Sequence, residues 1–326
     1  MSRRLKLIPY IGGKHHLAPK IVEVIQRFYP YHTTYVEVFG GGLSVFLAKD
    51  PSPIEVVNDI DSLIVNLYRV MRDPQAFRRF LRMVFFTPYA RSEHAYAQRK
   101  IKEFRKSGLQ LDPERPDPLL AWCVYVDFRM SISGQSGNRW GYAISSRRGK
   151  AALAHFAGQL MRIHKRFMRV QIEQDDFRMI IHRYDSPKTV FYLDPPYVRG
   201  VRRSPKLYFH EMSLEDHQDL VELLLKIQGG AVLSCYFHEV YQPLIDHGWI
   251  REDIEMPLHS IGSTRASGFV GDGIRRRHGH YAIETLLIKP PNPGYETALP
   301  LLGLLNRREE GDGHSHSREG FDASHH

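Results

Sequence analysis

The sequence has few of the residues that mark secreted, membrane-spanning or metal-binding proteins. Its two cysteines, Cys123 and Cys235, are far apart, and neither lies in a C-x-x-C motif. A disulfide framework and a structural zinc site are therefore not expected. No apolar run approaches the roughly 20 residues of a membrane-spanning helix, and the basic residues 1–10 lack the apolar core of a signal peptide. We expect a protein of the reducing cytoplasm with no metal site and no membrane contact.

The excess positive charge is confined to one internal segment. The 326 residues have a net charge of +9, and residues 72–150 alone hold 16 Lys and Arg against 7 Asp and Glu. The rest of the chain is therefore neutral. This concentration favours a segment that faces a nucleic-acid backbone. A solvated basic helix surface is the alternative interpretation.

Strand-like and helix-like patterns alternate outside this basic segment. Apolar residues at helical spacing predict a helix over residues 15–29, ended by Pro30, and another over residues 63–71. A third helix begins at Ser213, which forms a capping box with Asp216. Apolar runs predict strands at residues 35–39, 54–57, 170–172, 189–193, 232–236 and 281–288. This alternation predicts an α/β fold with a doubly wound, largely parallel sheet, interrupted by the basic segment as a mainly helical insertion.

Three glycines, residues 40–42, end the first predicted strand. The apolar residues 43–48 follow, which predicts the strand, glycine turn and helix of a mononucleotide-binding unit. The N-terminus of that helix would hold a carboxylate or a phosphate. Val45 stands where a dinucleotide fingerprint needs its third glycine, so a dinucleotide is disfavoured. Asp59, 19 residues after Gly40, stands where an acidic residue binds the ribose of an adenosine-containing cofactor; a helix N-cap ahead of Leu63 is the alternative.

Residues 194–197 read Asp-Pro-Pro-Tyr, directly after the strand predicted at residues 189–193. The exocyclic amine of adenine is a poor nucleophile because its lone pair is delocalised into the ring. Its two N–H groups would donate hydrogen bonds to the Asp194 carboxylate and to the Pro195 carbonyl, which would free the lone pair. The rings of Pro195 and Pro196 would hold that carbonyl in position. Tyr197 supplies a flat face on which a flipped base can stack. A Pro-Pro loop with a capping aspartate is the alternative.

Two other enzyme classes are disfavoured by their motifs. Gly12-Gly13-Lys14 lacks the earlier glycine of a phosphate-binding loop, and His15 replaces its Ser or Thr. The G-x-S-x-G nucleophile elbow of hydrolases does not occur.

Five segments resemble the Dam-like, alpha-class DNA adenine-N6 methyltransferases, and they occur in the family's order. They are residues 9–14 (PYIGGK), 37–42 (EVFGGG), 58–61 (NDID), 176–177 (DF) and 192–197 (YLDPPY). The similarity covers residues 9–289 except the insertion. It implies a site-specific enzyme that uses S-adenosyl-L-methionine to methylate an adenine flipped out of double-stranded DNA. It also implies a Rossmann-like methyltransferase sheet with an inserted target recognition domain.

The resemblance also implies domains and site residues. The catalytic domain would comprise residues 1–71 and 161–292 around a target recognition domain at residues 72–160, and the polar composition of residues 293–326 predicts a disordered tail. The catalytic residues would be Asp194, Pro195, Pro196 and Tyr197. The cofactor residues would be Tyr10, Gly12, Gly13, Lys14, Glu37, Phe39, Gly40, Gly42, Asp59, Asp176, Phe177 and Asp194. DNA contacts are expected from Arg129, Asn138, Arg139, Arg147, Arg148, Arg202 and Arg203.

The chain departs from the family at Tyr10, where many members have Trp, and at Val38, where many have Pro. Residues 130–150 resemble the DNA-reading hairpin of GATC-specific members only loosely, so a GATC target is not implied. Two alternatives stay open. One is another methyltransferase activity, on the cytosine amine or on adenine in RNA. Enzymes that methylate the cytosine amine favour Ser at the position of Asp194. The other alternative is a catalytically silent DNA-binding relative. A restriction endonuclease would be the partner within a restriction-modification system, whereas an orphan or phage enzyme would have none.

Overall fold

The computed structural model of the chain describes residues 5–10, 14–134, 136–141, 153–198, 209–257, 275–276 and 279–292. Residues 1–290 and 291–326 are separate units, and the fold below is that of the first. The predicted tail, residues 293–326, lies outside the described residues. None of the helices within the described ranges is both long enough and apolar enough to span a membrane.

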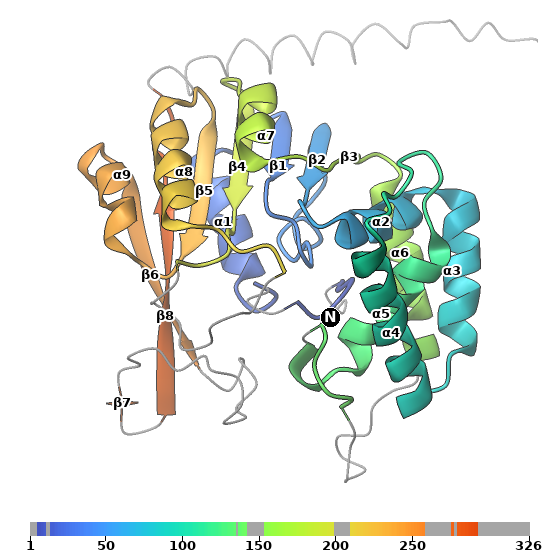
Figure 1. Cartoon of the computed structure of the whole chain (residues 1–326). Coiled ribbons are helices and arrows are strands. Elements are labelled where there is room, and N and C mark those ends of the chain that lie inside the picture. The colour runs from blue at the N-terminus through green and yellow to red at the C-terminus, as the bar shows by residue number, and fades with distance from the viewer. Residues whose placement is uncertain are drawn as a thin grey trace, which may run out of the picture. The chain divides into compact units, whose positions relative to one another are not determined.

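The centre of the fold is a sheet with the strand order β3-β2-β1-β4-β5-β8-β6 (Figure 1). Neighbours from β3 to β5 are parallel, whereas β8 runs antiparallel to β5 and to β6. The strands are β1 (Thr34–Glu37), β2 (Ile54–Asn58), β3 (Gln171–Glu173), β4 (Thr189–Leu193), β5 (Gly230–Cys235), β6 (Ile250–Pro257), β7 (Arg275–Arg276), which pairs with β8 alone, and β8 (Gly279–Ile288). All the predicted strands are present. Strand β6 was not predicted, because this edge strand has more charged than apolar residues.

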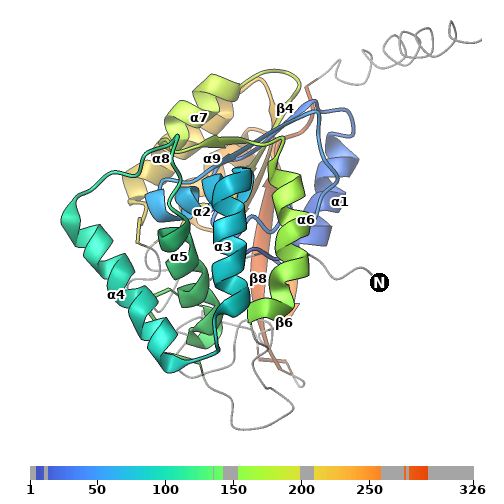
Figure 2. The same cartoon turned by 90° about the vertical axis from the view of Figure 1, so that its right-hand side faces the viewer.

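Helices cover both faces of the sheet. One face carries α1, and the other carries α7, α8 and α9 (Figures 1 and 2). These helices are α1 (Ala18–Phe28), α7 (Phe177–Tyr184), α8 (Leu214–Lys226) and α9 (Gln242–Asp246). Alternate residues of β4 enter two different cores, since Val190 and Tyr192 pack with α1 whereas Phe191 and Leu193 pack with α7 and α8. The predicted doubly wound, Rossmann-like sheet is therefore confirmed.

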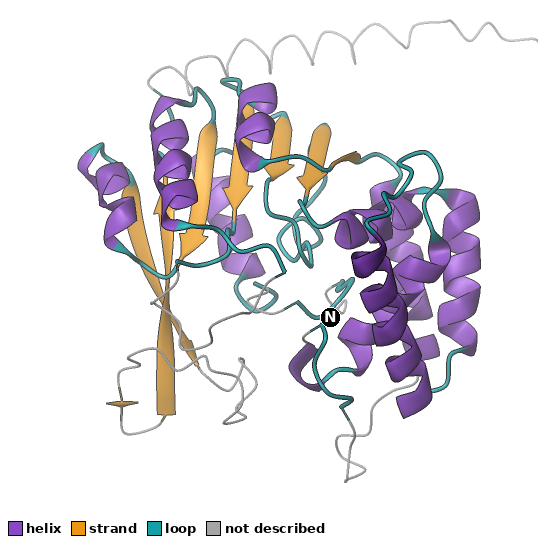
Figure 3. Cartoon of the chain, in the orientation of Figure 1, coloured by secondary structure: helices purple, strands orange, loops and turns teal. Residues whose placement is uncertain are grey.

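The chain between β2 and β3 is mainly helical, as predicted. Its helices lie together beside the β3 edge of the sheet (Figure 3). They are α2 (Ser62–Arg72), α3 (Pro74–Phe86), α4 (Arg91–Ser107), α5 (Pro118–Met130) and α6 (Ala157–Phe167). Helix α5 is buried along most of its length and packs against α2, α3 and α4. One continuous apolar core joins these helices to the sheet, and the boundaries of the target recognition domain stay a prediction.

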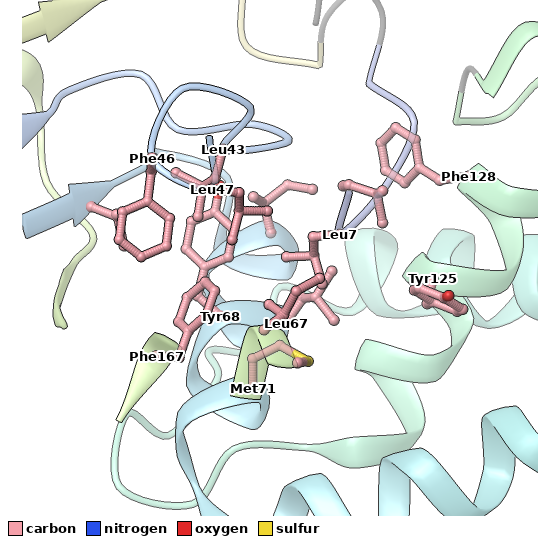
Figure 4. Packing of buried hydrophobic residues seen from close by; sticks show 14 of the residues in the cluster. Leu7, Leu43, Phe46, Leu47, Leu67, Tyr68, Met71, Tyr125, Phe128 and Phe167 are labelled. Atoms are coloured by element: carbon pink, nitrogen blue, oxygen red, sulfur yellow. The ribbon is translucent and has the colours of Figure 1, made fainter. Parts of the chain in front are cut away.

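The helix predicted after the glycine turn is wrong. Residues 44–48 form turns, and Leu43 before them has a left-handed φ of 52°. An α-helix beginning there would direct the Phe46 N–H to the carbonyl of residue 42. The buried Glu37 carboxylate accepts that N–H instead, at 2.9 Å. The apolar side chains of this turn pack against Tyr68 of α2 and Phe167 of α6 (Figure 4). Because residues 44–48 form turns and not an α-helix, this segment offers no helix N-terminus to hold an anion.

Candidate active site

A cavity lies at the carboxyl ends of the parallel strands β1 to β4. The chain runs from β1 outwards to β2 and β3 and then returns to β4 on the other side of β1. The ends of β1 and β4 therefore flank the point at which the strand order reverses, where open α/β sheets bind ligands. Residues 209–212, which precede α8, line the cavity as well.

All ten predicted cofactor residues that the structure describes line this cavity. They are Tyr10, Lys14, Glu37, Phe39, Gly40, Gly42, Asp59, Asp176, Phe177 and Asp194. The predicted Gly12 and Gly13 lie outside the described residues. The rings of Phe39 and Phe177 pack against each other with their centroids 5.7 Å apart. The sequence analysis did not select the other lining residues, among them Gly41, Asn58, Asp61, Tyr192 and residues 209–212.

The lining of the cavity is acidic, although the chain as a whole is basic. Eight carboxyl side chains line it, those of Glu37, Asp59, Asp61, Asp175, Asp176, Asp194, Glu211 and Asp216. Lys14 is the only Lys or Arg among the described residues that line it. Burial raises the pKa of Glu37 to about 8 and the pKa of Asp59 to about 7. A positively charged ligand would favour the ionised form of these carboxyls, whereas a phosphate would be repelled.

Asp59 holds the glycine turn against the end of β2. Its Oδ2 accepts the Gly41 N–H and its Oδ1 accepts the Asp61 N–H, both at 2.8 Å. Gly41 has a left-handed φ of 51°, and a Cβ there would approach the Tyr10 ring to 3.0 Å. The N-cap of α2 is Asp61, whose carboxylate accepts the Leu63 N–H at 3.0 Å. The N-cap alternative for Asp59 is therefore wrong.

A buried cluster of charged and hydroxyl groups surrounds Lys14. The Lys14 Nζ lies 2.6 Å from Asp194 Oδ1 and 3.3 Å from Glu284 Oε1, and it also donates to the Tyr197 hydroxyl. The hydroxyls of Tyr197 and Ser234 donate to Glu284 Oε1 at 2.9 and 2.8 Å. Burial raises the pKa of Asp194 to about 6, against the opposing charge of Lys14. Lys14 thus favours the carboxylate form of Asp194.

The four residues of the Asp-Pro-Pro-Tyr segment differ in exposure. Asp194 and Pro196 line the cavity, whereas Pro195 and Tyr197 are buried. The Tyr197 ring is only 3 % exposed and packs against Tyr236 at a centroid distance of 4.6 Å. Stacking of a base on Tyr197 therefore requires that this ring become accessible, and its stacking role stays a prediction.

The sequence analysis missed the contacts of the Tyr197 hydroxyl and the part that Glu284 plays in them. Glu284 lies on β8, 87 residues after Tyr197. No spacing along the chain signals this contact.

Arg129, for which a DNA contact is predicted, also makes contacts within the protein. Its Nη2 donates to the carbonyls of Lys6 and Leu7, at 2.6 and 2.9 Å. Its guanidinium also lies over the rings of Tyr125 and Phe156, 5.2 and 4.2 Å from their centroids. These contacts anchor the N-terminal segment to α5. The DNA contact of Arg129 stays a prediction.

Two of the predicted DNA-contacting residues lie in the loop after α5. The buried Asp127 carboxylate accepts the Ser136 hydroxyl at 2.6 Å and the Gly137 N–H at 3.0 Å. Gln98 Nε2 donates to the Asn138 carbonyl at 2.7 Å. These bonds hold the loop, and the next residue, Arg139, is exposed. The other four, Arg147, Arg148, Arg202 and Arg203, lie outside the described residues.

One family model matches most of the chain. The family model described as D12 class N6 adenine-specific DNA methyltransferase matches residues 10–243, which is more than half of the chain. The match includes the glycine turn, Asp59 and residues 194–197. No curated protein matches the chain.

Proposed function

Because the chain belongs to the D12 class of N6 adenine-specific DNA methyltransferases, we propose that it methylates a flipped adenine with S-adenosyl-L-methionine bound in the acidic cavity. Methylation of adenine N6 in DNA is the activity of the family. The methyl donor, the flipped base and the roles of single residues are proposals. The observation that carries them is the position of Asp194 in the lining of an acidic cavity at the ends of β1 and β4.

The charge of the cavity supports S-adenosyl-L-methionine as the donor. When bound, this cofactor supplies a methyl group on a positively charged sulfur. The eight carboxyl side chains and the single Lys among the described lining residues favour such a cation over a nucleotide with several phosphates. We propose that Asp59 receives the ribose hydroxyls and that Phe39 and Phe177, with Asp176 beside them, hold the adenine of the cofactor. Residues 40–42 would hold its methionine part.

Asp194 has the chemistry that amine methylation requires. Its ionised carboxylate accepts one N–H of the target amine, and the Pro195 carbonyl accepts the other. The nitrogen lone pair would then be free to take the methyl group from the sulfonium, whose sulfur keeps the electron pair of the broken bond, and the methylated nitrogen would release one proton. The positive charge of Lys14, 2.6 Å from Asp194 Oδ1, keeps the carboxylate ionised against its burial.

The helical insertion is the proposed target recognition domain. It contains all the excess positive charge of the chain. The exposed Arg139 lies in the loop after α5, which hydrogen bonds with Asp127 and Gln98 hold in place. Positive charge binds the phosphate backbone, whereas the target sequence is read by contacts to the bases. A base inside a duplex cannot reach both acceptors and the methyl donor at once, so we propose that the adenine is flipped out.

The test replaces Asp194 with Ala and follows methyl transfer and cofactor binding separately. Asp194→Ala is expected to lower methylation of DNA adenine by at least about 10²-fold, the scale of removing one transition-state hydrogen-bonding group. S-adenosyl-L-methionine should still bind, as measured by calorimetry. The matched control is Asp246→Ala, since Asp246 is an exposed residue of α9 whose hydrogen-bond partner, Gln242, lies on the same helix. Near-normal turnover of Asp194→Ala would refute the mechanism, and a wild-type protein that binds the cofactor without methylating DNA would indicate a silent relative.

A further inference from the structure

Two short segments form adjacent parts of the cavity lining although they are far apart in the sequence. Residues 59–61 follow β2, and residues 209–212 precede α8. Phe209 is 62 % exposed, so burial in the core does little to hold its ring. The position of the Phe209 ring therefore depends on the groups that contact it, whereas Met212, at the other end of this segment, is buried in the core.

Arg105, in the last turn of α4, contacts both segments. Its Nη2 donates to Asp61 Oδ2 at 2.7 Å. Its guanidinium carbon lies 3.4 Å from the centroid of the Phe209 ring. Asp61 is itself fixed, because its other carboxylate oxygen caps α2. Arg105 thus joins the rigid end of β2 to the exposed ring of Phe209.

We propose that Arg105 is a positioning residue that holds the Asp61 and Phe209 sides of the cavity together and thereby sets how tightly the cofactor is retained. The inference rests on the proposed binding of S-adenosyl-L-methionine in this cavity. It also means that the helical insertion contributes to the cofactor site as well as to DNA recognition.

The chemistry of arginine fits this double contact. A guanidinium is planar, so it donates hydrogen bonds in its plane while its face stacks on an aromatic ring. A lysine ammonium is a compact point charge and cannot reproduce both contacts with the same geometry. The side chains of Arg105 and Asp61 are only 22 % and 11 % exposed, so solvent weakens this ion pair less than a surface pair.

Arg105 is not needed to hold α4 in place. The helix packs through its buried residues His94, Ala97 and Ile101. His94 and Gln98 also bind the Asp127–Ser131 end of α5. A variant at Arg105 is therefore expected to remain folded.

The experiment measures the equilibrium binding and the dissociation rate of S-adenosyl-L-methionine, together with KM and kcat for methylation. Arg105→Ala should raise the cofactor Kd and KM about five- to tenfold, the effect of losing contacts worth about 1 kcal/mol. Dissociation should be faster by a similar factor, while kcat at saturating cofactor changes less than about twofold. Arg105→Lys should recover only part of the affinity.

Phe209→Ala provides a second, independent variant. It should weaken binding as Arg105→Ala does, and Phe209→Tyr, which keeps the ring, should recover most of the loss. The double variant Arg105→Ala/Phe209→Ala should be little worse than either single variant, because both remove one shared contact. Arg99→Ala is the matched control, since Arg99 lies on the same helix and stacks on Tyr96 instead.

Wild-type protein that binds the cofactor, together with an Arg105→Ala variant of unchanged Kd and dissociation rate, would overturn this inference alone. A loss of thermal stability and kcat with unchanged KM would also overturn it, because it would reveal a merely structural role. Wild-type protein that does not bind S-adenosyl-L-methionine at all would overturn the proposed function, and this inference with it.

Discussion

Replacing Lys14 with Met should move the pH dependence of methylation to higher pH. Methionine retains a straight side chain of similar length against the Tyr197 ring, but it removes the positive charge 2.6 Å from Asp194 Oδ1. Lys14 opposes the effect of burial on Asp194. Without it, the carboxyl keeps its proton to higher pH, and a protonated Asp194 cannot accept the amine N–H in the proposed way.

The size of the change follows from the geometry. Burial raises the pKa of Asp194 to about 6 even with Lys14 present. An opposite charge within this distance lowers the pKa of a carboxyl by about one to three pH units, so the variant should have an Asp194 pKa of about 7 to 9. At pH 7 the ionised fraction would fall from about nine-tenths to between about one half and about one hundredth. Activity at pH 7 should fall by the same factor and return at higher pH.

The assay is kcat/KM for S-adenosyl-L-methionine between about pH 5 and about pH 9, because this parameter reports the ionisation of the free enzyme. Lys20→Met is the matched control, since Lys20 is a surface lysine paired with Glu23. Its profile should match that of the wild type. If Lys14→Met loses activity by one constant factor at every pH, the electrostatic account of Lys14 is refuted and its role lies elsewhere in the site.

Further predictions concern four other residues. Asp59→Asn should weaken cofactor binding about ten- to a hundredfold, the scale of hydrogen bonds to a charged group, and unchanged calorimetric affinity would remove Asp59 from the ribose site. Tyr197→Phe should lower the free energy of unfolding by about 1–3 kcal/mol, because it removes the buried hydroxyl contacts, but should keep most of kcat; a loss of kcat as large as that of Tyr197→Ala would contradict the stacking role. Folded Glu37 has a pKa of about 8 against its usual 4.5, so it retains a proton that the unfolded chain has released, and stability should fall as the pH rises between these values. Glu37→Gln should therefore show a smaller decline of the melting temperature than the wild type over this range, and equal declines would refute the assignment. Arg139→Glu should reduce the log–log salt slope of DNA binding by at least about 0.9 if Arg139 meets one phosphate, and an unchanged slope would show that it does not.

Patterns among neighbouring residues were sufficient to predict most strands of the sheet, and the resemblance to a family selected residues that line one cavity. The apolar run at residues 189–193 predicted β4 at its observed bounds, and the Ser213–Asp216 pair predicted the start of α8, because these signals are local. The predicted cofactor residues gather in one cavity for a similar reason. Many of them directly follow a strand, and parallel strands bring their carboxyl ends to one edge of a sheet.

Contacts between distant elements were decided by the tertiary structure alone. Even within nine residues a side-chain contact escapes a periodic pattern, since the Phe46 N–H donates to Glu37 and the predicted helix at residues 43–48 is absent. Arg129 of α5 donates to backbone carbonyls of the N-terminal segment, and Arg105 of α4 contacts both Asp61 and Phe209. The sequence shows which face of an element is apolar, and apolar surfaces pack without strict direction. Buried charged groups, however, must find partners of the right geometry, because leaving them unpaired is costly. Those partners come from other elements, so they are determined only when the whole chain has folded.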